Sequence, residues 1–402
     1  MKIVKKIAEV ILSFLGIVLF LIGLYLLFNA LQTHNPKKLT EQQVKLYLKA
    51  LDPEKSNPYY FVADKFDTHD IVFVGEMHKR KQDLEFFSKL IPYLYETRKI
   101  KIIGWEFGAA DYQKDADSVV NASTFDRKKA ISILRRTDYG WCFEEYLEIF
   151  HTIWLVNRTV KNTTDRIKFL QLNAPYNPRK RSSTDTAIRN AEMKTYFDNV
   201  FPGIVEKEVL DKNRKILIYC GLHHSLTKFF TPKFLFLKDS GRGGQYLYKK
   251  YPGKIFQIVM LSPFYPKWFL FKGDQSAWVY PFDGVFNQLY DTLKRPFAVN
   301  ANYQPFAEVR DFNSFYAFDS WNGVRLKDFC DGAVMIAPFN EIEPIHIIKD
   351  WATTQQDLDE VKSVLPLADA KNIHTQQDLY KYMSPEDDRT QIKSIHRLPK
   401  FW

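Results

Sequence analysis

The longest hydrophobic pattern is a nearly unbroken apolar run close to the amino terminus. Residues 7–31 read IAEVILSFLGIVLFLIGLYLLFNAL, with few polar side chains among them. As a helix rising about 1.5 Å per residue, such a run crosses a hydrocarbon layer about 30 Å thick. Lysines at positions 2, 5 and 6 precede the run, which by the positive-inside rule keeps the amino terminus in the cytoplasm. The pattern therefore predicts an N-terminal transmembrane helix within residues 1–34.

A cleavable signal peptide is the alternative interpretation of this segment. The apolar region of a signal peptide is normally only about 7–15 residues long and is followed by small residues at the cleavage site. This run is longer, and the residues near its end are Phe28, Asn29 and Ala30. We therefore expect an uncleaved anchor, with residues 35–402 forming an extracytoplasmic domain in the periplasm or at the cell surface. Such a protein would meet the membrane through its N-terminal helix.

Beyond residue 43, short apolar runs alternate with longer stretches of helical spacing. Six of these runs are rich in β-branched residues and apolar on both faces, as buried parallel strands are. They cover residues 71–75, 100–105, 167–172, 215–220, 254–261 and 333–337. Helical spacing occupies, among others, residues 83–98, 141–160 and 185–199. The alternation predicts an α/β fold of three layers, a mainly parallel sheet flanked by helices.

Two further regions depart from this alternation. Residues 262–328 are crowded with Phe, Tyr, Trp, Pro and Asn, and we interpret them as a cap-like, aromatic-rich insertion over the sheet edge. Their rings either line a substrate pocket or build a small core of their own. Residues 345–402 are more polar and carry two helical patterns, at 353–365 and 375–383. This segment is expected to be a helical tail packed on the outside.

The charge balance is basic, with 57 Lys and Arg against 47 Asp and Glu, a formal net charge of +10. A nucleic-acid partner is not expected, because no known nucleic-acid module is recognisable and the basic cluster at 179–181 is short. For a membrane-tethered protein, attraction to anionic lipids or envelope polymers is a better explanation of the charge. The three cysteines are widely separated and include no CxxC pair, so neither a disulfide framework nor a cysteine-rich zinc site is expected.

Candidate catalytic side chains follow three of the predicted strands. Glu76 and His78 come directly after the first strand, Glu106 follows the second, and His223 and His224 follow the fourth. Ligands of parallel sheets bind beyond the carboxyl ends of the strands, so these side chains are expected to meet in one cleft. In an extended chain, residues two apart point to the same side. Glu76 and His78 should therefore share the cleft, while only one of His223 and His224 should face it.

The motifs Gly75-Glu76-Met77-His78, Trp105-Glu106-Phe107-Gly108 and Gly221-Leu222-His223-His224 resemble those of a known superfamily. It contains the erythromycin esterases, the TIKI and TraB-type proteins and the haem-uptake protein ChaN. The form of the first motif is closest to that of ChaN. Both histidine motifs have the Gly-x-x-His form, and this register selects His224 over His223 as the functional histidine.

The resemblance implies a hydrolase acting on a small-molecule or peptide substrate. In a metal-free mechanism, His78 or His224 would take a proton from water, while Glu76 or Glu106 fixes the histidine tautomer. In the TIKI-like alternative the same four residues, His78, His224, Glu76 and Glu106, would hold Zn²⁺, Mn²⁺ or Co²⁺ and an activated water. The ChaN-like alternative is a haem-binding or other ligand-binding envelope protein, with His or Tyr as the axial ligand. No GxSxG elbow is present, so a serine nucleophile is not expected.

Overall fold

A parallel sheet forms the centre of the molecule in a computed structural model that describes residues 2–31, 36–137, 139–175, 177–181, 183–194, 196–230, 241–267, 278–318, 320–383, 392–396 and 398. Its strands are Ile71–Glu76 (β1), Ile102–Ala109 (β2), Lys168–Asn173 (β3), Ile216–Gly221 (β4), Ile255–Met260 (β5), Phe297–Asn300 (β6) and Gly332–Met335 (β9). They lie in the order β3-β2-β4-β1-β5-β9-β6. All six predicted strands are confirmed. The seventh, β6, comes from the predicted insertion and pairs antiparallel with β9 at the edge of the sheet.

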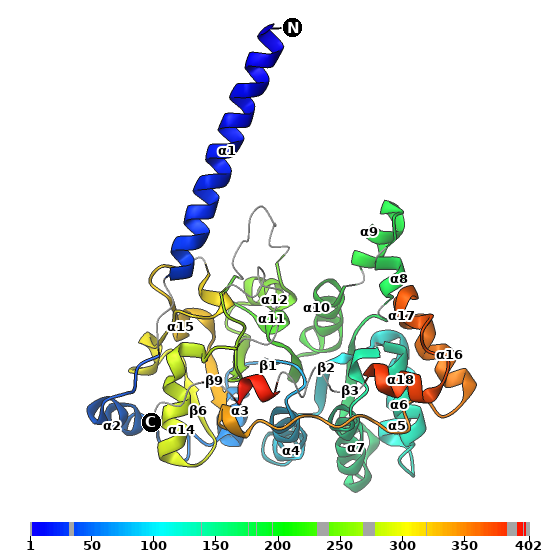
Figure 1. Cartoon of the computed structure of the whole chain (residues 1–402). Coiled ribbons are helices and arrows are strands. Elements are labelled where there is room, and N and C mark those ends of the chain that lie inside the picture. Colours follow the sequence, from blue (N-terminus) through cyan, green and yellow to red (C-terminus); the bar gives the residue numbers. More distant parts are fainter. Residues whose placement is uncertain are drawn as a thin grey trace.

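Helices cover both faces of this sheet, as the alternating pattern predicts (Figure 1). On one face lie α4 and α7, with α3, α5 and α6 beside them, and on the other face lie α10 and α12. The helices of the body are Glu41–Lys49 (α2), Pro58–Lys65 (α3), Lys81–Arg98 (α4), Gln113–Asn121 (α5), Arg127–Thr137 (α6), Glu144–Thr159 (α7), Pro178–Arg181 (α8), Thr186–Lys194 (α9), Phe197–Glu208 (α10), Leu222–Ser225 (α11), Gly243–Lys250 (α12), Val285–Leu293 (α14) and Leu326–Phe329 (α15).

Alternation along the strands assigns each side chain to one of these two faces. In β1, Val72 and Val74 belong to the core under α4 and α7, whereas Ile71 and Phe73 belong to the core under α10 and α12. Because successive residues of a strand point to opposite faces, Glu76 continues the α4 and α7 side. In β2 the same rule places Glu106 with Ile102, on the α10 and α12 side. The two strand-end glutamates therefore leave the sheet toward different helical layers.

The aromatic-rich region builds a third core and also reaches the site. Buried side chains of its described part, such as Phe264, Phe282 and Phe286, pack with strands β6 and β9. A short antiparallel pair, Arg310–Asp311 (β7) with Val324–Arg325 (β8), closes this region. Residues 268–277 of the predicted insertion lie outside the described residues. The two expected roles of the region, a small core and a pocket wall, are both present.

The region predicted as a helical tail contains the helices Gln355–Val364 (α16), Leu367–Ala370 (α17) and Gln376–Met383 (α18). It packs on α6, where the buried Arg135 guanidinium pairs with Asp357 and Glu360 at 2.5 and 2.6 Å. Leu358, Val361 and Leu379 from the tail complete the core on this face.

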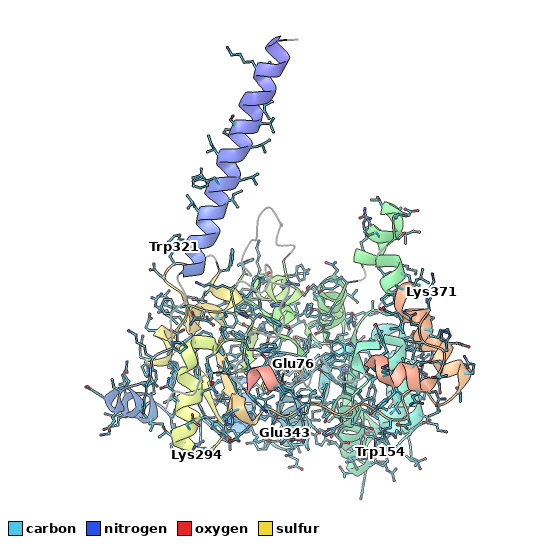
Figure 2. All side chains as sticks on the ribbon, viewed as in Figure 1. Glu76, Trp154, Lys294, Trp321, Glu343 and Lys371 are labelled. Atoms are coloured by element: carbon cyan, nitrogen blue, oxygen red, sulfur yellow. The ribbon has the colours of Figure 1, made fainter. Side chains whose placement is uncertain are left out.

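The predicted N-terminal helix forms as Lys2–Leu31 (α1) and projects away from the body (Figure 1). Near the end of α1 that is closest to the body, the Tyr25 ring lies 6.5 Å from the ring of Trp321, which Figure 2 labels near the base of α1. None of the helices in the described residues combines the length and apolarity needed to cross a membrane. The transmembrane assignment predicted from the sequence is therefore not confirmed.

Candidate active site

The first pair of site residues, Glu76 and His78, follows strand β1 directly. Nδ1 of His78 lies 2.8 Å from Oε1 of Glu76, as the spacing of two residues predicts. The Glu76 side chain is fully buried, whereas that of His78 is 38% exposed. The imidazole ring also packs edge-on against Trp141 and Phe107. Its orientation is therefore fixed by a buried carboxyl group on one side and by aromatic rings on another.

Two tyrosines hold the Glu76 carboxyl group from the α4 and α7 side of the sheet. The Tyr146 hydroxyl of α7 donates to Oε1 at 2.9 Å, and the Tyr219 hydroxyl of β4 donates to Oε2. Burial, together with the negative charge of Glu76, raises the pKa of both tyrosines well above the usual range. Both hydroxyls consequently remain protonated donors across the physiological pH range.

The second pair, Glu106 and His224, lies on the opposite helical side. Nε2 of His224 is 3.3 Å from Oε1 of Glu106, and its Nδ1 is 3.0 Å from Oδ2 of Asp198 on α10. The contact with Asp198 is an ion pair by distance, without the alignment of a hydrogen bond. Arg242 and the backbone N–H of Gly243 bind the same Asp198 at 3.2 and 2.9 Å. His224 is thus enclosed between two carboxylates.

Opposite charges fix the protonation states of this pair. Burial alone raises the pKa of Glu106, but the charges of His224 and His78 and the Gly221 N–H outweigh it and lower the pKa to about 2. For His224, burial disfavours the cation, yet Glu106 and Asp198 raise its pKa well above the usual value. His224 is therefore an imidazolium at neutral pH. For His78, burial lowers the pKa, but the hydrogen bond that its Nδ1–H donates to Glu76 and the charge of Glu106 raise it overall.

Gly221 at the end of β4 is the point at which the two pairs meet. Its N–H donates to Oε2 of Glu106 at 2.7 Å, and it lies beside Glu76 in the parallel register of β1 and β4. A β-carbon on Gly221 would lie 2.6 Å from Cε1 and 2.7 Å from Nε2 of His78, and 3.3 Å from Oε2 of Glu106. The absence of a side chain therefore lets His78 and Glu106 approach the same place. All four predicted site residues converge here, and Figure 2 labels one of them, Glu76, near the middle of the body.

A cavity of about 310 Å³ opens at this place. Tyr265, Trp278 and Tyr316 of the aromatic-rich region line it together with His78 and His224. Met77, Lys79, Arg80 and Leu222 also line it. The cavity therefore combines histidine side chains with an aromatic wall and two cationic side chains.

His223 also lines this cavity, and the prediction that only one of the two adjacent histidines faces it was wrong. Residues 222–225 form the short helix α11 instead of an extended chain, so successive side chains diverge by about 100° rather than 180°. The Tyr316 hydroxyl lies 2.9 Å from Nε2 of His223. Burial, with the neighbouring charge of Arg242, lowers the pKa of His223 to about 3, so this imidazole is neutral.

Sequence reasoning missed Asp198, Tyr146 and Tyr219. Asp198 lies inside the predicted helical stretch 185–199, and Tyr146 inside the stretch 141–160, where no motif marks either residue. Tyr219 occupies a predicted strand and was counted with the core. The one available signal was the alternation of β4, which places Tyr219 two residues before Gly221 on the face that Glu76 shares.

The metal alternative fails a test of donor availability. Other protein groups already contact most of the possible donor atoms, namely Nδ1 of His78, both carboxylate oxygens of Glu76 and both carboxylate oxygens of Glu106. Both ring nitrogens of His224 face carboxylates, Glu106 at 3.3 Å and Asp198 at 3.0 Å. No group of three or more His, Cys, Asp or Glu side chains within the described ranges is arranged to hold a metal ion. The four residues therefore do not fit Zn²⁺, Mn²⁺ or Co²⁺ in this arrangement.

Comparisons with known proteins find similar solved structures but no matching family. A scan of protein-family models matches none of them, and a search of curated proteins likewise finds no match. Similar solved structures include a succinoglycan biosynthesis protein, at 11% identity and a TM-score of 0.44, covering 78% of this chain and 96% of that one.

Two further similar solved structures are those of an erythromycin esterase and of ChaN. The first is a histidine-to-asparagine mutant of the erythromycin esterase EreC in its open conformation, at 12% identity and a TM-score of 0.43, covering 75% of this chain and 94% of that one. The second is ChaN of Campylobacter jejuni, which binds haem cofacially, at 13% identity and a TM-score of 0.35, covering 50% and 84%.

Proposed function

We propose that this protein is a hydrolase of esters or related acyl compounds, of small-molecule or peptide size, that works without a metal. One observation carries the proposal. His78 is bound through Nδ1 to the buried Glu76 and presents its other face to a cavity at the carboxyl edge of the sheet. A carboxylate that holds one imidazole nitrogen leaves the other nitrogen in the tautomer that accepts a proton.

In this mechanism His78 is the general base. Its unprotonated Nε2 removes a proton from a water molecule, and the oxygen of that water attacks the acyl carbon of the substrate to give a tetrahedral intermediate. The bond from the acyl carbon to the leaving oxygen or nitrogen then breaks, and the leaving group takes the proton from Nε2 of His78, which restores the free base. Glu76 stabilises the imidazolium that forms, and Tyr146 and Tyr219 keep the carboxyl group in place. General-base assistance of this kind contributes about 10² to 10⁴ in rate.

The second pair acts as a positioning element. His224 has both nitrogens against carboxylates, so it cannot accept a proton from water. It instead neutralises Glu106, which in turn fixes the backbone of Gly221. The cationic side chains of Lys79 and Arg80 line the cavity, and they supply positive charge where the attacked oxygen becomes negative.

The test is a screen of chromogenic esters and peptides with the full-length chain in detergent. We expect turnover of at least one ester, reduced at least 100-fold in His78→Ala and unchanged in His151→Ala. His151 is a matched control, because its Nδ1 lies 3.1 Å from Glu148 in a comparable but solvent-exposed pair. Turnover that is insensitive to His78→Ala would contradict the proposal.

Haem binding is the second candidate, and the environment of His78 favours it. A histidine whose Nδ1 is fixed by a carboxyl group, beside an aromatic wall, is suited to axial ligation of iron. The volume of about 310 Å³ lies at the lower end of ligand sites, about 300–1,000 Å³, and this favours a small substrate over a macrocycle. A Soret band that appears on haem titration and is lost in His78→Ala would support haem binding instead.

We also propose that α1 attaches the protein to a membrane, with the main domain outside the cytoplasm. The proposal is supported by the basic residues before the apolar run and by the exposure of its described apolar side chains, such as Leu12, Phe14 and Phe20. The full-length chain should remain with membranes after carbonate extraction. The double variant Ile17→Arg/Leu21→Arg should appear in the soluble fraction. Leu367→Arg, at an exposed position on the body, should stay with the membranes. Extraction of the unmodified chain would contradict this proposal.

A further inference from the structure

A second cavity, of about 630 Å³, lies at the opposite edge of the sheet from the candidate active site. Strands β2, β3 and β4 begin there, at Ile102, Lys168 and Ile216. Its described lining consists of two isoleucines, two threonines and seven basic residues. These are Ile100, Ile102, Thr163, Thr164, Arg98, Lys99, Lys101, Arg166, Lys168, Arg214 and Lys215. We call this cavity the basic groove.

The charge of the basic groove is far greater than composition explains. Lys and Arg make up 57 of 402 residues, so about one or two of eleven lining residues should be basic, yet seven are, and none is acidic. Acidic residues at the rim pair with three of them, Arg98, Lys101 and Lys168. Among the described residues, no carboxylate forms an ion pair with the other four. The groove therefore keeps an excess of positive charge.

We propose that the basic groove binds a small soluble ligand carrying two or more phosphoryl groups. Arginine guanidinium groups bind phosphoryl oxygens through paired N–H donors, and lysines add point charges. The hydroxyl groups of Thr163 and Thr164 are further donors of the kind that phosphoryl oxygens accept. A volume of about 630 Å³ lies within the range of small-ligand sites, about 300–1,000 Å³. The first residues of strands β2 and β3, Ile102 and Lys168, are part of the lining.

A nucleic acid fits this groove less well. Sites for single strands place aromatic side chains under the bases, and the described lining of the groove contains no aromatic residue. The groove is also separate from the catalytic residues, so ligand binding here does not depend on the proposed hydrolase. His78→Ala should bind the ligand as the unmodified protein does.

The test is isothermal titration calorimetry of the full-length protein in detergent with inorganic tripolyphosphate at low salt. We expect one saturable site, weakened by added salt because the contacts are electrostatic. The charge-reversal variant Lys99→Glu/Arg214→Glu should bind at least tenfold more weakly, and both positions are exposed, so the fold should tolerate the change. Lys128→Glu/Lys371→Glu is the matched control, because it alters the net charge equally at two exposed positions elsewhere. It should change the affinity by less than twofold.

Three results would overturn the proposal. The first is the absence of saturable binding at low salt. The second is an equal loss of affinity in the variant and its control, which would mean that only net charge matters. The third is tighter binding of citrate or of a short single-stranded oligonucleotide than of tripolyphosphate. Circular dichroism of the charge-reversal variant should give the spectrum of the unmodified protein, which shows that the variant is folded.

Discussion

Oε1 of Glu76 lies 2.8 Å from Nδ1 of His78, at the point where strand β1 leaves the sheet. This one contact joins a fully buried carboxyl group to an imidazole whose side chain is 38% exposed. Two tyrosine hydroxyls donate to the same carboxyl group from the core. The pair therefore has the arrangement of a general base, His78, and the carboxylate that orients it, Glu76.

Glu76→Gln should lower kcat/KM by about 10² to 10⁴, because the amide supplies no negative charge to stabilise the imidazolium. The pH profile should move as well. The pKa of His78 is raised above its usual 6.5, in part by Glu76, and a general base acts only when unprotonated. In the unmodified enzyme the activity should therefore rise with pH through a pKa above 6.5, and in Glu76→Gln the rise should occur at lower pH.

The control for this substitution is Glu148→Gln at the exposed Glu148–His151 pair, which should leave both the rate and the profile unchanged. A profile that stays in place while the rate falls would indicate that Glu76 acts only through packing.

Gly221→Ala should reduce kcat/KM by about 10². The alanine β-carbon would lie only 2.6 Å from Cε1 of His78 and would displace the imidazole ring. A displacement of about 1 Å in catalytic geometry lowers the rate by about this factor. Gly203→Ala is the matched control. A β-carbon there has no neighbour within 4 Å, and alanine within a helix is favoured over glycine by about 0.5–1 kcal/mol. Equal activity of the two variants in a steady-state ester assay would show that the ring position is unimportant.

Glu106→Gln should lower the free energy of unfolding by about 3 kcal/mol at pH 6, because it leaves the buried His224 cation with one carboxylate fewer. The folded-state pKa of Glu106, about 2, lies below its ordinary 4.5. Its stabilising effect is therefore complete above about pH 4.5 and is lost as the pH falls through about 2. Urea denaturation should show the difference between the two proteins shrinking toward pH 2.5.

Glu208→Gln provides the comparison for Glu106. The pKa of Glu208 is also lowered to about 2, but its partners, Lys168 and Lys212, are 36% and 41% exposed. Solvated pairs contribute about 0–1 kcal/mol, so this variant should lose much less stability. Equal losses in the two variants would contradict the role given to burial.

Asp83→Asn should make the protein more stable above pH 7. Burial and the nearby charge of Glu76 raise the pKa of Asp83 to about 7, so in the folded protein this group holds a proton that it would lose when unfolded at neutral pH. Its contribution is fully present below pH 3.8 and declines as the pH rises through 7. Relative to Asn, the unmodified protein should lose up to about 4 kcal/mol between pH 4 and pH 8.

Denaturation midpoints of Asp83→Asn, compared with those of Asp64→Asn, whose side chain is 43% exposed, measure this effect. A constant difference across the pH range would mean that Asp83 ionises normally.

Much of the fold follows from local pattern. The six strand predictions succeeded because buried parallel strands are apolar on both faces, a signal that needs no knowledge of distant contacts. The four predicted site residues come together in space for a related reason, since the carboxyl ends of parallel strands share one edge. Glu76, Glu106 and the two histidine motifs are therefore close in space although they span about 150 residues of sequence.

The remaining features depend on long-range packing that no local pattern contains. Asp198 reaches His224 only because α10 packs across the face toward which Glu106 points. The direction of His223 depends on a single helical turn after β4. Strand β6 was missed because its four residues, 297–300, lie in a region rich in aromatic side chains and become a strand only by pairing with β9.

The most direct test of the central claim is chemical rescue of His78→Ala by free imidazole. If His78 is the general base, the variant should lose at least 100-fold in kcat/KM for a chromogenic ester. Added imidazole should restore part of that rate with saturation, because removal of the side chain leaves space beside Gly221. An unimpaired His78→Ala variant, or an impaired one whose rate imidazole raises no more than it raises the uncatalysed reaction, would contradict the account.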